Sequence, residues 1–264
     1  MALCELHYFS PALCKQTAAM VILPEGDFRP PYAVMYLLHG LSDDHTIWQR
    51  RTSIERYVAD YPLIVVMPDG GRGFYTDAKE GDAWETALVR DLIGFVDTRF
   101  QTRASRAGRC IGGLSMGGYG AVKLALKHPG LFCSAVSHSG ALGRAHRSVL
   151  SDPDNPFAAE LRRIFGEDPT GGPEDLFTLA ERLQPAKRPA LRIDCGTDDF
   201  LLEDNRGFHA HLEKLGYPHE YAEFPGGHDW GYWDLHVQEA IAFHARHLGL
   251  ERREAPGVDV TKKE

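Results

Sequence analysis

A serine that stands between two glycines is the pattern in this chain that points most directly to chemistry. The segment 113–117 reads Gly-Leu-Ser-Met-Gly, with Ser115 at its centre. The preceding residues, 109–114, can form a strand, and the small residues from Gly117 onward can begin a helix. A serine on a sharp strand-to-helix turn exposes its hydroxyl above the carboxyl edge of a sheet, and flanking glycines permit the close packing there. The pattern therefore predicts that Ser115 is a nucleophile.

A serine hydroxyl needs a base and a carboxylate to react near neutral pH, and both follow downstream. Residues 191–195 are typical of a buried strand, and the turn after them contains Asp198 and Asp199. Another predicted strand, residues 219–224, leads into a glycine-containing loop that carries His228. His228 can take the serine proton, and a carboxylate can hold the imidazole in the required tautomer. From order and spacing alone, either aspartate could be that acid.

Acyl transfer also needs hydrogen-bond donors for the negative charge that develops on the carbonyl oxygen. The apolar segment 35–38 is predicted to be a strand, and it ends in His39-Gly40-Leu41-Ser42. In hydrolases with such a serine turn, the loop after this strand donates one backbone N–H, and the residue after the nucleophile donates the other. The predicted donors are the N–H groups of Leu41 and Met116.

The elements that must position these residues alternate between strands and helices. Segments 3–10 and 18–24 are predicted to form an opening antiparallel pair, followed by strands at 34–38 and 63–67. Apolar residues recur every four positions in two predicted helices, namely Trp84, Leu88, Leu92, Val96 and Phe100, and Trp233, Val237, Ile241, Ala245 and Leu248. This alternation predicts an α/β fold, with a mostly parallel sheet covered on both faces and the site at the carboxyl ends of the strands.

The length fits one domain over residues 1–250. Between residues 141 and 189 the alternation gives way to Asp-Pro, Asn-Pro and Gly-Gly-Pro turns, which indicates a cap-like insertion over the site. Residues 251–264 form a charged tail that we expect to be flexible.

Composition argues against several other classes of protein. The net charge is −8, and the sequence shows no cluster of basic residues. Nucleic acids and anionic membranes are therefore not expected as partners. No segment is apolar for long enough to cross a bilayer, and no export signal is evident, so we expect a cytoplasmic protein. The cysteines show no paired spacing and are expected to be reduced, and no histidine cluster has the spacing of metal ligands. We expect no metal.

Seven segments together resemble the tributyrin esterase branch of the putative esterase family. They are residues 36–40, 65–68, 73–77, 113–121, 139–142, 195–201 and 227–230. The family also contains S-formylglutathione hydrolases, feruloyl and acetylxylan esterases and the antigen 85 mycolyltransferases, and its members have the α/β-hydrolase fold. The resemblance extends from about residue 3 to about residue 248.

The resemblance implies that Ser115 is the nucleophile and His228 the base. It also favours Asp199 over Asp198, because the catalytic aspartate of relatives stands three residues after a glycine and just before a Phe-Leu pair or a similar one. Asp198 would then be a turn residue.

For the substrate, the resemblance implies that Trp48, Tyr75 and Trp230 surround the acyl pocket, although each aromatic residue could equally be core packing. Glutathione-specific relatives carry a Ser-Gly-Leu-Thr-Cys type of sequence where this chain has residues 38–42, Leu-His-Gly-Leu-Ser. Formylglutathione is therefore disfavoured.

These features together predict a serine carboxylesterase that hydrolyses small esters with acetyl to butyryl chains through an acyl-enzyme intermediate, without a cofactor. The alternatives are an S-formylglutathione hydrolase, a feruloyl- or acetylxylan-type esterase, an acyltransferase with the same catalytic residues, and a non-catalytic binding module on the same fold. The expected partner is a small ester, and a homo-oligomer is possible.

Overall fold

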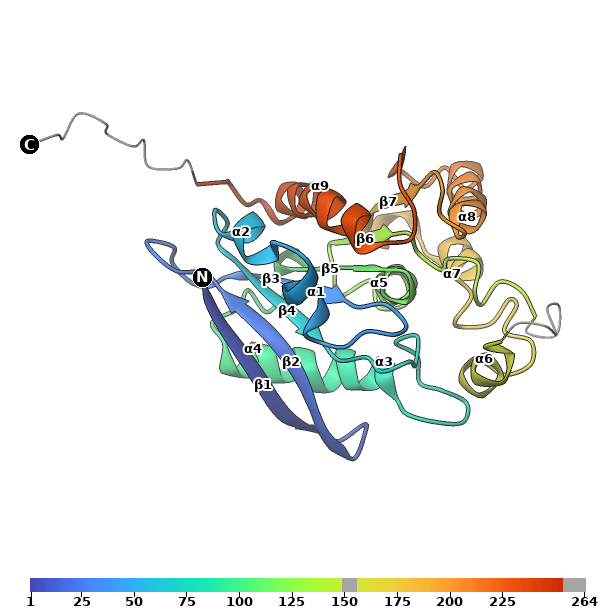
Figure 1. Ribbon diagram of the computed structural model, residues 1–264, viewed down its shortest axis with the longest axis horizontal. Coiled ribbons are helices and arrows are strands. Elements are labelled where there is room, and N and C mark those ends of the chain that lie inside the picture. The colour runs from blue at the N-terminus through green and yellow to red at the C-terminus, as the bar shows by residue number, and fades with distance from the viewer. Residues whose placement is uncertain (149–155, 254–264) are drawn as a thin grey trace, which may run out of the picture.

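One eight-stranded sheet crosses the molecule in the order β1-β2-β4-β3-β5-β6-β7-β8 (Figure 1). The computed structural model describes residues 1–148 and 156–253. The strands are β1 (Ala2–Ser10), β2 (Lys15–Leu23), β3 (Ala33–Leu38), β4 (Leu63–Pro68), β5 (Arg109–Leu114), β6 (Ser134–His138), β7 (Ala190–Gly196) and β8 (His219–Phe224). Pairing is antiparallel from β1 to β2 and from β2 to β4, and parallel from β4 onward. The predicted mostly parallel α/β sheet is confirmed.

Helices cover both faces of this sheet, and its central strands are buried throughout, as is typical of parallel sheets. Successive side chains of a strand point to opposite faces. In β3, Tyr36 and Leu38 belong to the apolar cluster that contains α5 residues, whereas Met35 and Leu37 belong to the cluster that contains α9 residues.

The helices follow strands β3 to β8 in sequence and pack on these two faces (Figure 1). They are α1 (Ile47–Arg51), α2 (Ile54–Val58), α3 (Trp84–Thr86), the π-helical segment η1 (Ala87–Leu92), α4 (Ile93–Arg99), the 3-10 turn η2 (Arg106–Gly108), α5 (Met116–Lys127), α6 (Ala158–Phe165), α7 (Leu176–Arg182), the 3-10 turn η4 (Pro185–Lys187), α8 (Leu202–Lys214) and α9 (Trp230–Leu248). In the described part of the chain, no helix is both long and apolar enough to span a membrane.

The two predicted helical stripes occur in the structure with shifted ends. The first runs through α3, η1 and α4, where Trp84, Leu88, Leu92 and Val96 are buried. Side chains four residues apart are displaced by about 40° around the axis of an α-helix. The wider turn of the π-helical segment reduces this displacement, which keeps the four side chains on one face. Phe100 lies just after this helix. In α9 the helix begins earlier than predicted, at Trp230, because the carboxylate of Asp229 caps it.

The strand β6 and the helix α8 were not predicted from the sequence, and neither were the short elements α1, α2 and η2. β6 contains Ser134, Ser137 and His138, all fully buried, and so lacks the apolar pattern of a central strand. α8 follows β7 after a short turn. The described part of segment 141–189 contains α6, α7 and η4, but residues 149–155 lie outside the described ranges, as do residues 254–264 of the predicted tail. The domain boundaries stay a prediction.

Candidate active site

Ser115 occupies the turn between β5 and α5 in a conformation that is rare for residues other than glycine, with φ 52° and ψ −115°. Its N–H donates to the carbonyl oxygen of His138 at 2.9 Å, and its own carbonyl oxygen accepts from the N–H of Ala141 at 3.1 Å. Strained backbone of this kind persists where the surrounding contacts over-determine it. The strand, turn and helix around Ser115 are those predicted.

The glycines beside Ser115 let the end of β3 pack directly on the start of α5. A Cβ atom on Gly117 would lie 2.5 Å from the carbonyl oxygen of Leu38 and 2.6 Å from that of His39. A Cβ atom on Gly113 would lie 2.6 Å from the carbonyl carbon of Gly117. Only glycine allows this approach, which places the loop after β3 next to the nucleophile candidate.

The structure brings Ser115, His228 and Asp199 into one series of hydrogen bonds. Ser115 Oγ lies 3.0 Å from His228 Nε2, and His228 Nδ1 lies 2.9 Å and 3.1 Å from the two carboxylate oxygens of Asp199. Burial alone would raise the pKa of Asp199, but its hydrogen bonds with His228 and with the N–H of Leu201 outweigh burial, so the pKa is lowered from its ordinary value. Asp199 is thus a carboxylate at neutral pH, able to hold an imidazole with a proton on Nδ1.

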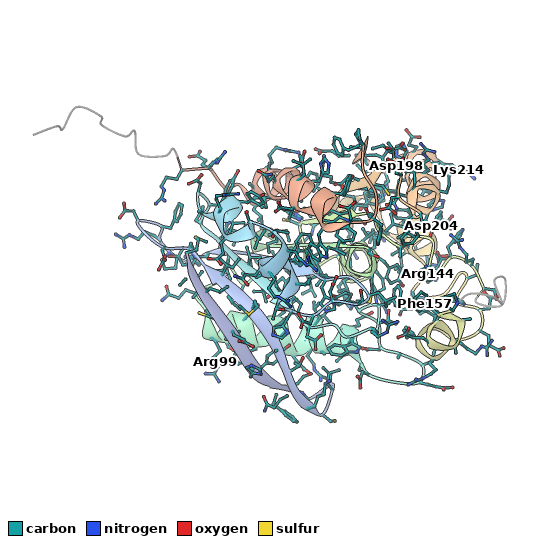
Figure 2. The ribbon with its side chains drawn as sticks, viewed as in Figure 1. Arg99, Arg144, Phe157, Asp198, Asp204 and Lys214 are labelled. Carbon is teal, nitrogen blue, oxygen red and sulfur yellow. The ribbon has the colours of Figure 1, made fainter. Side chains whose placement is uncertain are left out.

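The neighbouring Asp198 lies elsewhere. Its N–H donates to the carbonyl oxygen of Gly226 at 2.9 Å, and the residue is exposed (Figure 2). Of the two aspartates left open by spacing, Asp199 is the one whose carboxylate lies against His228, in the turn just after β7.

The two predicted oxyanion donors, Leu41 and Met116, both line the cavity that contains Ser115. Met116 is the first residue of α5, where backbone N–H groups have no acceptor within the helix and where the helix dipole favours negative charge. A Cβ atom on Gly40, just before Leu41, would lie 3.8 Å from Ser115 Cβ. The loop after β3 is therefore close enough to contact a group bound at Ser115.

A small and mostly apolar cavity of about 80 Å³ opens beside Ser115. Its lining residues are Leu41, Phe74, Ser115, Met116, Ala141, Arg144, Phe157, Leu161, Phe200 and Leu201. Arg144 and Phe157 lie in the same region near α6 and α7 (Figure 2). Leu161 belongs to α6, so segment 141–189 contributes to the wall of the site, as an insertion over it would.

The aromatic residues Trp48, Tyr75 and Trp230 are not among these lining residues. Trp48 is buried, donates from Nε1 to the carbonyl oxygen of Leu38 at 2.9 Å, and stacks edge-on with Trp230 at 5.3 Å between ring centroids. Tyr75 is buried, and its hydroxyl bonds to the backbone of His39. Trp48 and Tyr75 thus support the end of β3, and substrate contact by the three residues stays a prediction.

The aromatic residues that do line the cavity are Phe74, Phe157 and Phe200, which sequence reasoning did not assign. Phe74 and Phe200 stand within segments that carried the family resemblance, next to Tyr75 and Asp199. The ring centroids of Phe200 and His228 lie 4.5 Å apart, and Phe200 is 74% exposed. A large apolar side chain that is exposed beside a reactive group indicates a binding surface, and this exposure can be recognised only in the structure.

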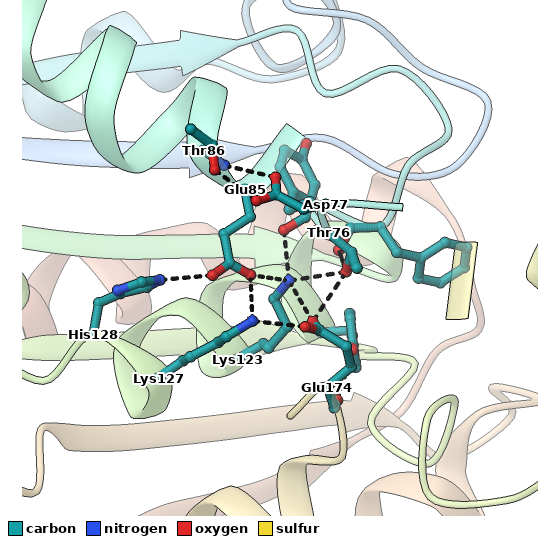
Figure 3. A network of polar contacts seen from close by, with 11 residues as sticks. Thr76, Asp77, Glu85, Thr86, Lys123, Lys127, His128 and Glu174 are labelled. Atoms are coloured by element: carbon teal, nitrogen blue, oxygen red, sulfur yellow. Dashed lines mark hydrogen bonds and ion pairs between the residues drawn. The ribbon is translucent and has the colours of Figure 1, made fainter. Parts of the chain in front are cut away.

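A buried ion network fixes the helix that follows Ser115 (Figure 3). Lys123 of α5 is fully buried, and its ammonium lies 2.6 Å from the carbonyl oxygen of Tyr75, 2.8 Å from Glu85 and 2.9 Å from Glu174. Lys127, one turn later, lies 3.0 Å from Glu85 and 2.6 Å from Glu174. The network joins α5, α3, the Tyr75 loop and the segment before α7.

We expect Lys123→Met to lower the free energy of unfolding by about 3–5 kcal/mol, because it leaves buried carboxylates without their fully buried cation. Lys127→Met is the matched control and should cost less, since the Lys127 side chain is 24% exposed. Urea unfolding at pH 7 measures both. Equal costs would contradict this role for Lys123.

The same network predicts a pH dependence. Burial would raise the pKa values of Glu85 and Glu174, but contacts with Lys123 and Lys127, joined at Glu85 by His128, outweigh it and lower both from the ordinary 4.5. Stability from a lowered carboxyl pKa is complete above the unfolded value and is lost as the pH falls. The wild type should therefore lose more stability below about pH 4.5 than Lys123→Met does.

Within the described ranges, no group of three or more His, Cys, Asp or Glu side chains could hold a metal ion. What the site offers is a hydroxyl, an imidazole and a carboxylate in hydrogen-bond contact, with backbone donors and a small apolar cavity beside them. That arrangement can activate a serine for attack on a carbonyl carbon.

Comparison with known proteins agrees with this chemistry. The model of a family described as putative esterase matches residues 10–244. An acetyl esterase from Caldicellulosiruptor saccharolyticus is 30% identical over a match that covers 93% of this chain and 99% of that protein.

Solved structures of serine hydrolases are similar over most of the chain, and they confirm the α/β-hydrolase fold. The Staphylococcus aureus fluorophosphonate-binding serine hydrolase FphF has a TM-score of 0.84 and 32% identity, covering 92% of this chain and 98% of that one. The S-formylglutathione hydrolase FrmB from Staphylococcus aureus has a TM-score of 0.81 and 31% identity, with the same coverage of 92% and 98%.

Proposed function

Since the chain belongs to the putative esterase family and is a carboxylic ester hydrolase, we propose that it cleaves small esters whose acyl chains range from acetyl to butyryl. The observation that carries this proposal is the hydrogen-bonded series Ser115–His228–Asp199 beside a cavity of about 80 Å³. We assign the nucleophile to Ser115, the general base to His228 and the orienting carboxylate to Asp199.

In the proposed reaction, Ser115 Oγ attacks the ester carbonyl carbon while His228 Nε2 takes the hydroxyl proton. The carbonyl oxygen becomes an oxyanion, which accepts hydrogen bonds from the N–H groups of Leu41 and Met116. Asp199 stabilises the imidazolium through Nδ1. The tetrahedral intermediate collapses as the C–O bond to the alcohol breaks and His228 gives its proton to the leaving oxygen. Water then attacks the acyl-enzyme in the same way and releases the acid and free Ser115.

The size of the cavity supports a short acyl chain. At about 80 Å³ the cavity is small beside the roughly 300–1,000 Å³ of typical small-molecule pockets, so it suits a short acyl chain better than a long one. Each methylene that fits gains about 0.8 kcal/mol, or roughly fourfold in kcat/KM, while the first one that clashes loses more. Specificity should therefore rise with chain length and then fall abruptly.

We expect kcat/KM for p-nitrophenyl esters to be highest between acetyl and butyryl and to collapse by octanoyl. Leu161→Ala, which removes part of the cavity wall, should shift the optimum toward longer chains. Ile164→Ala on the same helix, outside the cavity lining, should leave the preference unchanged. Efficiency that kept rising through decanoyl esters would contradict the short-acyl proposal. Tributyrin tests the upper end of the proposed range.

The chain is similar to a protein named S-formylglutathione hydrolase. The thioester S-formylglutathione is therefore the second candidate substrate. Its hydrolysis would use the same residues, so only a direct comparison of kcat/KM for S-formylglutathione and p-nitrophenyl acetate separates the two. An alcohol acceptor added to the ester assay would likewise detect acyl transfer, as a new ester product in place of free acid.

A further inference from the structure

His39, just after β3, has a hydrogen-bond partner at each of its polar atoms: the Tyr75 hydroxyl for its backbone, and the backbone of Gly40 and Gly70 for its ring. The residue is 1% exposed. Its N–H donates to the hydroxyl of Tyr75 at 3.0 Å, and that hydroxyl donates to the carbonyl oxygen of His39 at 3.2 Å. The position of the His39 backbone is therefore fixed from both sides by one buried side chain.

The hydrogen bonds of the imidazole assign its tautomer. Nε2 lies 2.9 Å from the backbone nitrogen of Gly70, whose N–H can only donate, so Nε2 is the acceptor. A neutral ring that accepts at Nε2 carries its proton on Nδ1. Nδ1 lies 2.7 Å from the carbonyl oxygen of Gly40 and donates to it. Asp69 Oδ1 is 3.5 Å from Nε2, too far for a competing hydrogen bond of normal length.

The carbonyl group that receives this bond shares a peptide unit with the N–H of Leu41. A trans peptide is planar, so Gly40 C=O and Leu41 N–H point in opposite directions, and fixing one fixes the other. The N–H of Asp43 also donates to this oxygen, at 3.3 Å. Donation to a peptide carbonyl polarises the whole unit and makes its N–H a stronger donor.

We propose that His39 is a positioning residue of the oxyanion hole. Its Nδ1–H holds the carbonyl of Gly40 and thereby aims the N–H of Leu41 at the oxygen that becomes negatively charged. This inference rests on the proposed function, in which Leu41 is an oxyanion donor. The ring itself is not part of the cavity lining and takes no proton from the reacting groups.

Two substitutions separate the hydrogen bond from His39 Nδ1 to Gly40, which positions Leu41, from the hydrogen bond that His39 Nε2 accepts from Gly70. In His39→Gln, the side-chain amide oxygen can take the place of Nε2 and accept from Gly70, but no donor remains at the Nδ1 position. In His39→Asn, the amide nitrogen can take the place of Nδ1 and donate to Gly40, but the bond from Gly70 is lost. His39→Gln thus removes only the hydrogen bond to Gly40, and His39→Asn removes only the one from Gly70.

We expect His39→Gln to lower kcat for p-nitrophenyl acetate by about 10- to 100-fold with little change in KM, because the Leu41 N–H acts chiefly in the transition state. His39→Asn should keep kcat within about threefold of the wild type even if its melting temperature falls further. A trifluoromethyl ketone, which binds serine hydrolases as an oxyanion, should lose affinity for His39→Gln by a factor similar to the loss in kcat.

Equal losses of kcat in the two variants, losses that follow melting temperature, or a change confined to KM would overturn the inference. Should His39→Gln not fold, His39→Asn decides alone, since a drop of more than about tenfold in its kcat would contradict the aiming role. The proposed function fails separately, if Ser115→Ala keeps its activity. An active wild type, an inactive Ser115→Ala and a His39→Gln of full activity would overturn only the inference.

Discussion

The Ser115→Ala variant is expected to lose ester hydrolysis almost completely while it folds like the wild type. Its hydroxyl is the proposed covalent acceptor of the acyl group, and removing one member of such a triad costs about 10⁴- to 10⁶-fold in kcat. Only one oxygen atom is removed, so the loss of packing is small. Hydrolysis of p-nitrophenyl acetate and covalent labelling by a fluorophosphonate both measure the effect.

Ser137→Ala is the matched control, because Ser137 is another buried serine, on the neighbouring strand β6. It should keep the hydrolytic rate within a few-fold and should still be labelled. A rate for Ser115→Ala above about a hundredth of the wild-type rate would show that another residue is the nucleophile.

The second large effect is expected at Asp199. Asp199→Asn should lower kcat by about 10⁴-fold, because an amide at this position favours the wrong tautomer of His228 and cannot stabilise the imidazolium. The side chain has nearly the same size and shape, so the thermal unfolding of Asp199→Asn should stay close to that of the wild type. Steady-state kinetics on p-nitrophenyl acetate measures the loss.

Asp198→Asn gives the control in the adjacent position, with the same change of chemistry. Since Asp198 is exposed and bonds through its backbone to Gly226, its substitution should change kcat by less than about tenfold. If Asp198→Asn were the more damaging variant, the acid would have to be assigned to Asp198.

The fold class and the centre of the candidate site could be predicted from the sequence because their signals are local. The turn at Ser115 needs small residues within two positions of the serine, and the loop of His228 follows its strand directly. Alternating apolar segments predict the sheet and its helices in the same way. By contrast, β6 was missed because His138 and Ser134 are polar, and their partners, Asp194 and His244 at 2.8 Å each, come from distant segments.

The sequence by itself therefore determined the strand-to-helix turn at Ser115, the order of serine, acid and histidine, and the mostly parallel sheet, all of which depend on neighbours along the chain. Spacing left Asp198 and Asp199 open and the family resemblance favoured Asp199, but only the tertiary structure shows its carboxylate against His228, since adjacent side chains leave a turn in different directions. It likewise decided that Phe74, Phe157 and Phe200, rather than Trp48 and Tyr75, line the cavity. Which ring faces a cavity, and whether a lysine such as Lys123 is buried, depends on residues from distant segments, and the folded chain alone brings those together.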